Sequence, residues 1–472
     1  MLFPAIHLFI GVAVIMREIA RLSRRGRLDS LSYIMVVFAI IYGFAPFVFH
    51  LANLAGYAHN WTPYLDYARQ PYGIEVVLII AAYLGLLAGW QIGGSLPVSR
   101  WRSVAQYEFA PDQRMVRRLV ILAWGLLIVS CLLYLLWSKP YGGISGVYQH
   151  AIAIRGGWID IINPFAFLKR FCRLALFSSY LFFALLHIGT MKLHRRLFIQ
   201  AGFILSVVVS LNYLLVNGAR LHLAFYCCIF IIAFLLIRHE RPTISRLLPA
   251  LAISLVLLYF GTTIFNAAYL RLDPQTSVDV AAGAPPASMT FLLDDFSFPV
   301  ISGVTAVRAI SREQVELRYG LDLVLGVAYM VPKQFAPQLP EKISAVNTEL
   351  ISPGKIGEIP VDLIALGVYN FGLFGPPLLA FLFALGGRCL QGMLSGMRLR
   401  VLRIVMLTVF GLYLAQSITY TDPVTMMYDG FALFFGLVLL YLIVLPNGPG
   451  RRLPAPSHVS SLRKGVVCPH NE

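Results

Sequence analysis

Apolar runs of about twenty residues recur along most of the chain, with short polar or basic segments between them. A run of that length crosses the hydrocarbon core of a bilayer as one helix. The pattern predicts an all-α polytopic membrane protein with about eleven spans. The predicted spans lie near residues 1–16, 31–50, 73–95, 119–138, 171–189, 197–217, 221–237, 247–270, 361–387, 404–420 and 428–446. The first run precedes its basic cluster, the reverse of a cleavable signal peptide, so residues 1–16 are predicted to be a retained span.

The apolar pattern stops between residues 271 and 360, where Pro, Gly and acidic residues are spread through amphipathic stretches such as 301–318. We interpret 271–360 as one large, partly helical extracytoplasmic loop, and 139–170 as a second outer loop. The predicted organisation is therefore spans one to eight in 1–270, the large loop in 271–360 and three more spans in 361–446. A disordered cytoplasmic tail is expected over 447–472.

Composition supports lipid as the solvent of this chain. Hydrophobic residues make up 58% and charged residues 13%, whereas about a quarter of a soluble protein is charged. The net charge of +16 does not indicate nucleic-acid binding, because 24 of the 38 Lys and Arg lie in alternate short loops and in the tail. Basic residues collect on the cytoplasmic side of membrane proteins. The N-terminus is thus predicted outside and the C-terminus inside.

Several familiar motifs are absent from the sequence. It contains no Walker A loop, no dinucleotide fingerprint, no His-Glu-x-x-His and no Cys-x-x-Cys pair, so we expect neither a cofactor nor a metal site. None of the 6 cysteines falls in the large loop. Any chemistry must therefore come from scattered polar side chains.

Arg220 is the first candidate, since it lies where two apolar runs meet at the predicted outer surface. An ionisable residue at a membrane edge is a functional candidate by default, and a guanidinium suits bidentate contact with phosphate. The competing interpretation is an arginine that extends to the lipid headgroups.

The large loop contains no histidine, so carboxylates are its candidate general bases. Asp294 and Asp295 interrupt an apolar stretch, where partial burial would raise a carboxyl pKa toward a useful value. Alternatively, one of them caps the helix that follows. Glu349, Glu358 and His222 are the reserve candidates for the base.

Short motifs in the second half resemble the Wzy-type oligosaccharide repeat unit polymerases. They are, in order, Tyr319-Gly320, Val331-Pro332-Lys333, Pro340-Glu341-Lys342 and the segment from Gly367 to Pro376, which contains Tyr369-Asn370-Phe371-Gly372. Gly218-Ala219-Arg220 also resembles the family's Gly-Ser-Arg. The family's arginine-glycine loop signatures are not matched, because Ala166 stands where one pattern requires Gly.

The resemblance implies a GT-C-like glycosyltransferase in the bacterial inner membrane. Its substrate would be an undecaprenyl-diphosphate-linked oligosaccharide, polymerised into O-antigen, capsule or exopolysaccharide. Its partners would be membrane lipid and the chain-length regulator and flippase of the same pathway. The residues expected to bind the diphosphate or glycan are Arg220, Arg155, Arg271, Arg308, Lys333 and Tyr369.

Two other functions fit the same layout. An O-antigen ligase shares it but uses a histidine of the large loop, which this loop lacks, although His150 and His222 lie near the outer face. A glycan flippase or other transporter would show inverted repeats and interrupted helices with charges at the midplane.

The distribution of basic residues predicts the orientation directly. Reporter fusions at Ser277 and Ser460 should report opposite sides of the membrane, with Ser277 outside. Fusions that report the same side would contradict this topology.

Overall fold

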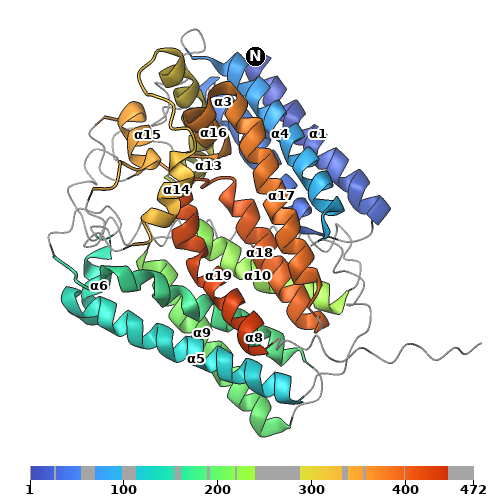
Figure 1. The fold of residues 1–472 in the computed structure, drawn as a ribbon, viewed down its shortest axis with the longest axis vertical. Helices are drawn as coiled ribbons and strands as arrows, with labels where there is room; N and C mark the ends of the chain where they lie inside the picture. Colours follow the sequence, from blue (N-terminus) through green and yellow to red (C-terminus); the bar gives the residue numbers. More distant parts are fainter. Residues whose placement is uncertain are drawn as a thin grey trace, which may run out of the picture.

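The computed structural model is a bundle of helices, and every regular element in its described residues is helical (Figure 1). The structure describes residues 2–25, 28–54, 70–97, 113–151, 154, 161–188, 192–217, 220–239, 287–331, 338–353, 358–397 and 399–444. Within these ranges, 9 helices are long and apolar enough to cross a membrane. This confirms a polytopic membrane protein.

Two of the predicted spans are not among those nine. The run at 171–189 forms a 3-10 helix, η5 (Ala166–Arg173), followed by α8 (Leu174–Leu186), which is only 13 residues long. Nearly all of α8 is buried in the bundle. An apolar run of this kind is therefore as typical of a helix packed in the protein core as of a membrane span. The predicted span 247–270 and the tail 447–472 lie outside the described residues.

The predicted run 361–387 contains a sharp break. It forms α16 (Leu363–Phe371) and α17 (Gly375–Ser395), joined through Gly372. Gly372 has φ 62° and ψ −148°, a conformation open essentially to glycine alone. Gly367 and Gly375 then meet backbone to backbone, where any side chain would overlap the opposite helix.

The buried side chains form two main apolar cores. One joins α1 (Leu2–Arg25), α2 (Ser30–Ala39), α4 (Tyr72–Ser95), α16 and α17. The other joins α5 (Gln113–Ser138), α8, α9 (Leu193–Val216), α10 (Arg220–Arg238) and α19 (Pro423–Val444). Helix α18 (Arg400–Ser417) contributes to both cores and lies between the two groups in Figure 1.

The large loop is built into the first group. Its described part holds α13 (Ala287–Ser311), α14 (Leu321–Ala328) and α15 (Ile343–Ile351). Ala306, Val307 and Ala309 of α13 are buried in the core that α1, α4 and α16 form. The loop therefore shares its hydrophobic core with the bundle instead of forming a separate domain.

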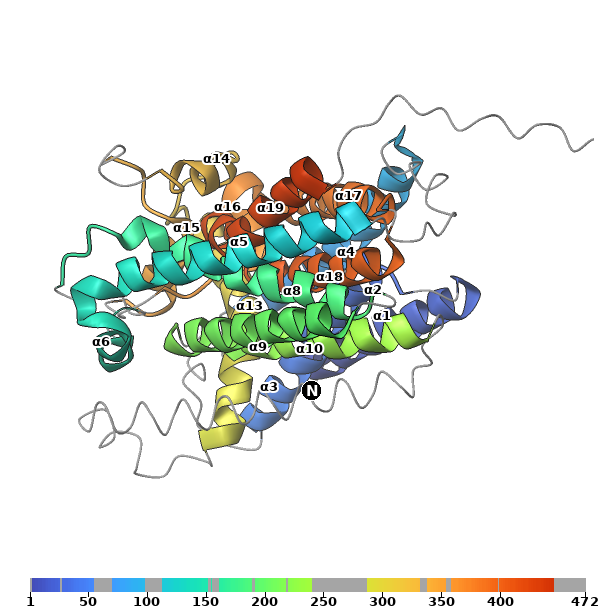
Figure 2. The same cartoon turned by 90° about the horizontal axis from the view of Figure 1, so that it is seen from below.

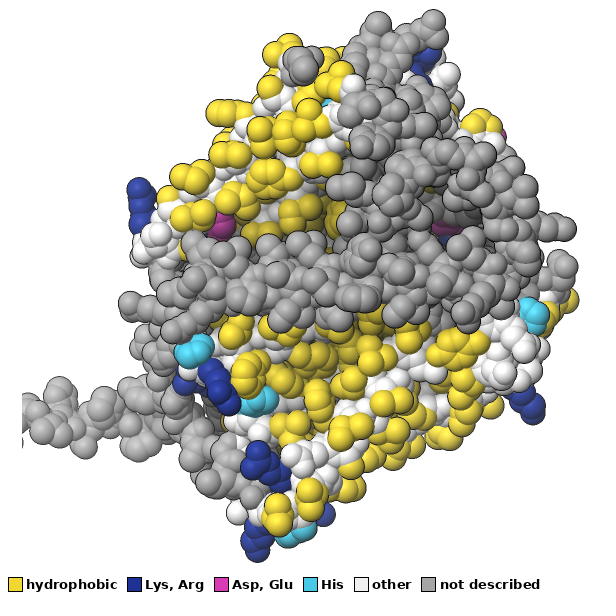
Figure 3. All heavy atoms as spheres, turned by 180° about the vertical axis from the view of Figure 1, so that it is seen from behind, with side chains coloured by type: hydrophobic (Ala, Val, Ile, Leu, Met, Phe, Trp, Pro, Cys, Tyr) yellow, Lys and Arg dark blue, Asp and Glu magenta, His cyan; other side chains and the backbone are white. Residues whose placement is uncertain are grey.

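Elements of both predicted outer loops gather at one end of the bundle. Figures 1 and 2 place α14, α15 and α6 (Gly143–Gln149) there, and the basic start of α5 and the end of α17 at the other. Figure 3 shows apolar side chains over the described part of one broad face, with most Lys and Arg at its margins. This arrangement fits a surface that meets lipid, with its charged ends in the interfaces.

Helices α4 and α17 run parallel and touch along a row of glycines. Gly85, Gly89 and Gly93 face Pro377, Phe381 and Arg388 in turn. Small residues spaced four apart let the backbones of membrane helices approach closely. This seam joins an N-terminal span to a C-terminal one.

The seam predicts opposite effects for two identical substitutions in α4. A methyl group at Gly89 would overlap the backbone of Phe381, whereas one at Gly73 meets nothing within 4 Å. We expect Gly89→Ala to destabilise the protein by about 1–3 kcal/mol, and Gly73→Ala to be neutral or slightly stabilising. Thermal unfolding of the purified variants measures both, and equal effects would contradict the seam.

Candidate functional site

The arginines and carboxylates chosen from the sequence are only partly described. Arg155, Arg271 and Lys333 lie outside the described residues. Arg220 is the first residue of α10, and Asp294 and Asp295 lie in α13, but the structure does not describe these three side chains. Their roles stay predictions.

The helix-cap interpretation of Asp294 or Asp295 is wrong. Helix α13 begins at Ala287, so both residues lie two turns inside it, where no free N-terminal N–H remains to donate to their carboxylates. A cap at either residue requires the helix to begin after it, whereas the helix already contains residues 287–293.

Arg308 and Tyr369 are described, and both join the large loop to the bundle. Arg308 Nη1 donates to Gln70 Oε1 at 3.4 Å. Tyr369 is fully buried, and its hydroxyl donates to Asn347 Oδ1 at 3.1 Å. In this conformation both side chains are engaged within the protein, and their contact with glycan stays a prediction.

Two of the family-like motifs lie against each other. The backbone N–H of Tyr319 donates to the Asn370 carbonyl at 2.9 Å, and that of Gly320 donates to Asn370 Oδ1 at 3.0 Å. Asn370 Nδ2 in turn donates to Asp322 Oδ2 at 2.9 Å. Both Tyr319 and Gly320 have positive φ, and the Tyr319 side chain is 77% exposed. The contact thus presents an exposed aromatic ring next to the start of α14.

A second polar cluster joins α10, α19 and the boundary of η5 with α8. Arg173 forms an ion pair with Asp429 Oδ1, and Asp429 Oδ2 lies 2.9 Å from His222 Nε2. The guanidinium also lies 5.7 Å and 5.6 Å from the ring centres of Tyr213 and Tyr428. Arg173 and Asp429 are 9% and 15% exposed, and His222 is 24% exposed. The imidazole is therefore the part of the cluster that solvent reaches most easily.

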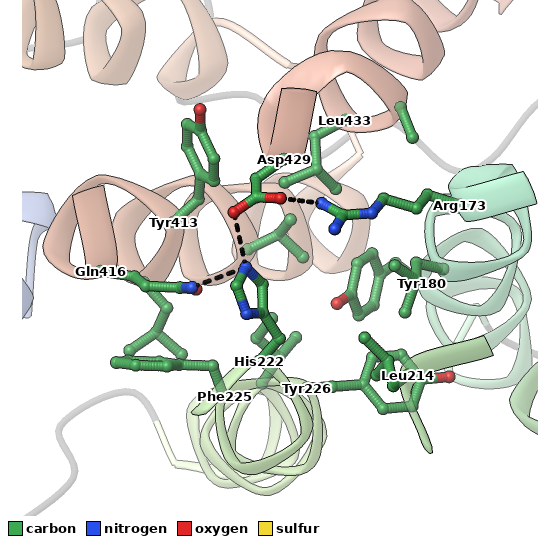
Figure 4. Close-up of a pocket in the computed structure, with 15 residues that line it drawn as sticks. Arg173, Tyr180, Leu214, His222, Phe225, Tyr226, Tyr413, Gln416, Asp429 and Leu433 are labelled. Atoms are coloured by element: carbon green, nitrogen blue, oxygen red, sulfur yellow. Dashed lines mark hydrogen bonds and ion pairs between the residues drawn. The ribbon is translucent and has the colours of Figure 1, made fainter. Parts of the chain in front are cut away.

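The cluster fixes which histidine nitrogen carries the proton. Asp429 accepts only, so Nε2–H of His222 must donate to it. Gln416 Nε2 lies 2.8 Å from the same ring nitrogen, and the Gln416 amide must turn its oxygen to the ring in this protonation state. Nδ1 lies on the far side of the ring from Asp429 (Figure 4) and makes no hydrogen bond with a described residue. In a neutral ring with this tautomer, Nδ1 is the nitrogen that can accept a proton.

A cavity of about 60 Å³ adjoins this cluster. Leu176 and Tyr180 of α8, Phe225 and Tyr226 of α10 and Leu433 of α19 contribute to its mostly apolar wall. This space is large enough for a small polar group such as a hydroxyl.

Two further basic residues precede Arg173 in η5. Lys169 lies 5.7 Å from the Trp137 ring centre, and Arg170 Nη1 donates to the Met330 carbonyl at 2.6 Å. Burial, together with the nearby Arg173, lowers the pKa of the Lys169 ammonium to about 8. Three basic residues therefore lie close together in η5, and the last of them pairs with Asp429.

The sequence contained one usable sign of this cluster. Arg173 lies in the predicted span 171–189 and Asp429 in 428–446, and opposite charges inside two apolar runs often pair. His222 was only a reserve candidate, and Arg173, Asp429 and Gln416 were missed. No group of three or more His, Cys, Asp or Glu that would suit a metal ion occurs among the described residues.

Comparison with known proteins adds no relative. Neither a protein-family model, nor a characterised protein, nor a solved structure matches this chain. The class that its fold defines is the polytopic α-helical membrane protein. A GT-C architecture and eleven spans stay predictions.

The burial of Arg173 predicts that its counter-ion supports the fold. Asp429→Asn leaves a buried guanidinium without a charged partner, which typically costs about 3–5 kcal/mol. The variant should unfold at a markedly lower temperature in detergent. The pair Arg173→Met with Asp429→Leu should recover much of the loss, because both charges are removed together.

The control is the exposed pair Lys342–Glu358, whose side chains are 31% and 43% exposed. Glu358→Gln should change stability by at most about 1 kcal/mol. Equal losses of stability in the Asp429→Asn and Glu358→Gln variants would mean that the buried pair contributes no more to stability than the exposed pair.

Proposed function

We propose that this protein is a polymerase that joins polyprenyl-diphosphate-linked oligosaccharide repeat units at the outer face of a bacterial cytoplasmic membrane. The observation that carries the proposal is the His222–Asp429 pair, whose imidazole borders a cavity. The motif resemblance supplies the substrate class. The distribution of basic residues supports the proposed orientation, because it favours this end of the bundle for the outside.

The chemistry requires a base for a neutral hydroxyl and cations for an anionic leaving group. The terminal hydroxyl of a fresh repeat unit attacks the anomeric carbon of the growing glycan, and the bond from that carbon to the lipid diphosphate breaks. His222 Nδ1 takes the hydroxyl proton, while Asp429 holds the ring and stabilises the imidazolium that forms. The diphosphate leaves with its negative charge.

Positive groups near this end suit the leaving diphosphate. Arg220 lies two residues before His222 at the start of α10, and a guanidinium grips phosphate oxygens in bidentate fashion. Lys169 adds a further cation at the same end. Arg173 is already engaged by Asp429, so we assign it the positioning of the base and not substrate contact.

The exposed ring of Tyr319 suits the sugar. Aromatic faces present apolar surface with a polar edge, and the backbone contacts between Tyr319-Gly320 and Asn370 hold this ring at the outer end. The sugar ring would bind outside the cavity and direct only its hydroxyl toward His222.

A ligase is the second candidate, and the His222–Asp429 pair favours it as much as the polymerase. An O-antigen ligase would use the same base and the same leaving group, with lipid A core as the acceptor. The two differ in the product, so a glycan gel from a deletion strain separates them. Single-repeat capping of the core means polymerase, whereas an unsubstituted core means ligase or flippase.

The proposal predicts the effect of removing the base. His222→Gln should lower chain extension by about 10²- to 10⁴-fold, the usual contribution of general base catalysis. Protein level should stay unchanged, because an amide can still donate to Asp429. The length distribution of the glycan on gels, with immunoblots of the membrane fraction, measures both.

The matched control is His187→Gln. His187 ends α8 at the opposite end and bonds the Phe183 carbonyl through Nδ1 at 2.9 Å, so this variant should polymerise normally. If the His222→Gln variant makes glycan of normal length, the His222–Asp429 pair has a structural role only. Asp294 and Asp295 would then be the candidates for the base.

A further inference from the structure

A histidine and a glutamate face each other inside the first helix group, away from the cluster around His222. His7 of α1 and Glu75 of α4 are 0% and 1% exposed. His7 Nε2 lies 3.9 Å from Glu75 Oε2, and neither atom has a hydrogen-bond partner among the described residues. An ionisable group buried in a membrane span requires a charged or hydrogen-bonding partner that offsets the cost of removing it from water.

A widened turn in the second span determines the histidine tautomer. Residues Ile40–Phe44 form a π-helix, η1, between α2 and α3 (Ala45–Leu54). His7 Nδ1 lies 2.9 Å from the backbone carbonyl of Tyr42 in this turn. A carbonyl only accepts, so Nδ1 carries the ring proton, and Nε2 of a neutral ring presents a lone pair to Glu75.

Two lone-pair atoms therefore face each other in a closed, apolar setting. An ionised Glu75 beside a neutral His7 would place an unpaired negative charge in the core, which is strongly unfavourable. A single proton on the pair removes this repulsion, and closing the 3.9 Å gap between Oε2 and Nε2 to about 2.7–3.0 Å would complete a hydrogen bond. The side chain of Glu75 lies beside Gly303 of α13, where an added methyl group would come into contact with its Cγ atom.

The other titratable groups around the pair are on η1, α3, α4 and α16. The His50 ring centre lies 5.6 Å from that of His7 and 5.4 Å from that of Tyr72. The Tyr42 hydroxyl donates to Asp362 Oδ2 at 2.6 Å. Among the described residues, none of these groups brings a Lys or Arg side chain to Glu75.

We propose that His7 and Glu75 form a buried proton-binding site in which the Glu75 carboxyl holds the proton and donates it to His7 Nε2. The site lies near the outer ends of α1 and α4, and its ligand is a proton. It is independent of the glycan chemistry, since neither residue belongs to the cluster around His222.

Infrared spectroscopy of the full chain in lipid nanodiscs tests the site at neutral pH. The intact protein should show the carbonyl stretch of a protonated carboxyl, which shifts in D₂O. Glu75→Gln should remove one carboxyl equivalent of that band. His7→Phe should keep the band but move it to higher frequency, because the acceptor of the hydrogen bond is lost.

Glu18 is the matched control, because it is 3% exposed in the same helix as His7 but is paired with Arg21 at 2.6 Å. Glu18→Gln should remove carboxylate absorption and leave the carboxyl band intact. The proposal is overturned if the intact protein shows no protonated-carboxyl band. It is also overturned if Glu75→Gln removes carboxylate absorption, or if His7→Phe leaves the frequency unchanged. None of these outcomes bears on the polymerase proposal.

Discussion

The ion pair between Arg173 and Asp429 is the interaction on which the packing of the second helix group depends. It joins the start of α8 to α19, and the guanidinium is enclosed by the rings of Tyr213 and Tyr428. Each ion offsets the free-energy cost of burying the other. Because Asp429 stays charged, its second oxygen can orient His222. One carboxylate thus serves both the packing of three helices and the tautomer of the candidate base.

The first helix group depends on backbone proximity instead. Glycines bring α4 against α17 and α16 against α17, and α13 inserts its apolar face into the same core. The large loop is anchored there a second time, through Asn370, which accepts from Gly320 and donates to Asp322. The loop and the spans consequently form one packed unit, and a movement of the loop would have to move α16 with it.

The sequence predicted most spans well because lipid imposes a simple rule of length and polarity on each one. It failed where tertiary contacts override that rule. The run containing Arg173 starts as a 3-10 helix and continues as a short buried helix, because its basic side chains find partners such as the Met330 carbonyl and Asp429. Arg173 and Asp429 are 256 positions apart, and nothing local in one sequence links them. The start of α13 was misplaced because small polar residues carry little signal for a helix boundary.

The widened turn at Ile40–Phe44 also sets how the second span meets its neighbours. One additional residue in a turn rotates everything after it by about 100° relative to a regular helix. The part before the turn packs Leu31, Ile34 and Phe38 into the main core, and the part after it places Phe49 against Phe298 of α13 and Ile351 of α15. The second span therefore packs against two different sets of neighbours through two differently oriented faces. The number of residues in this span is therefore fixed. Deleting one residue would rotate Phe49 away from the loop helices, although the hydropathy of the span would stay the same.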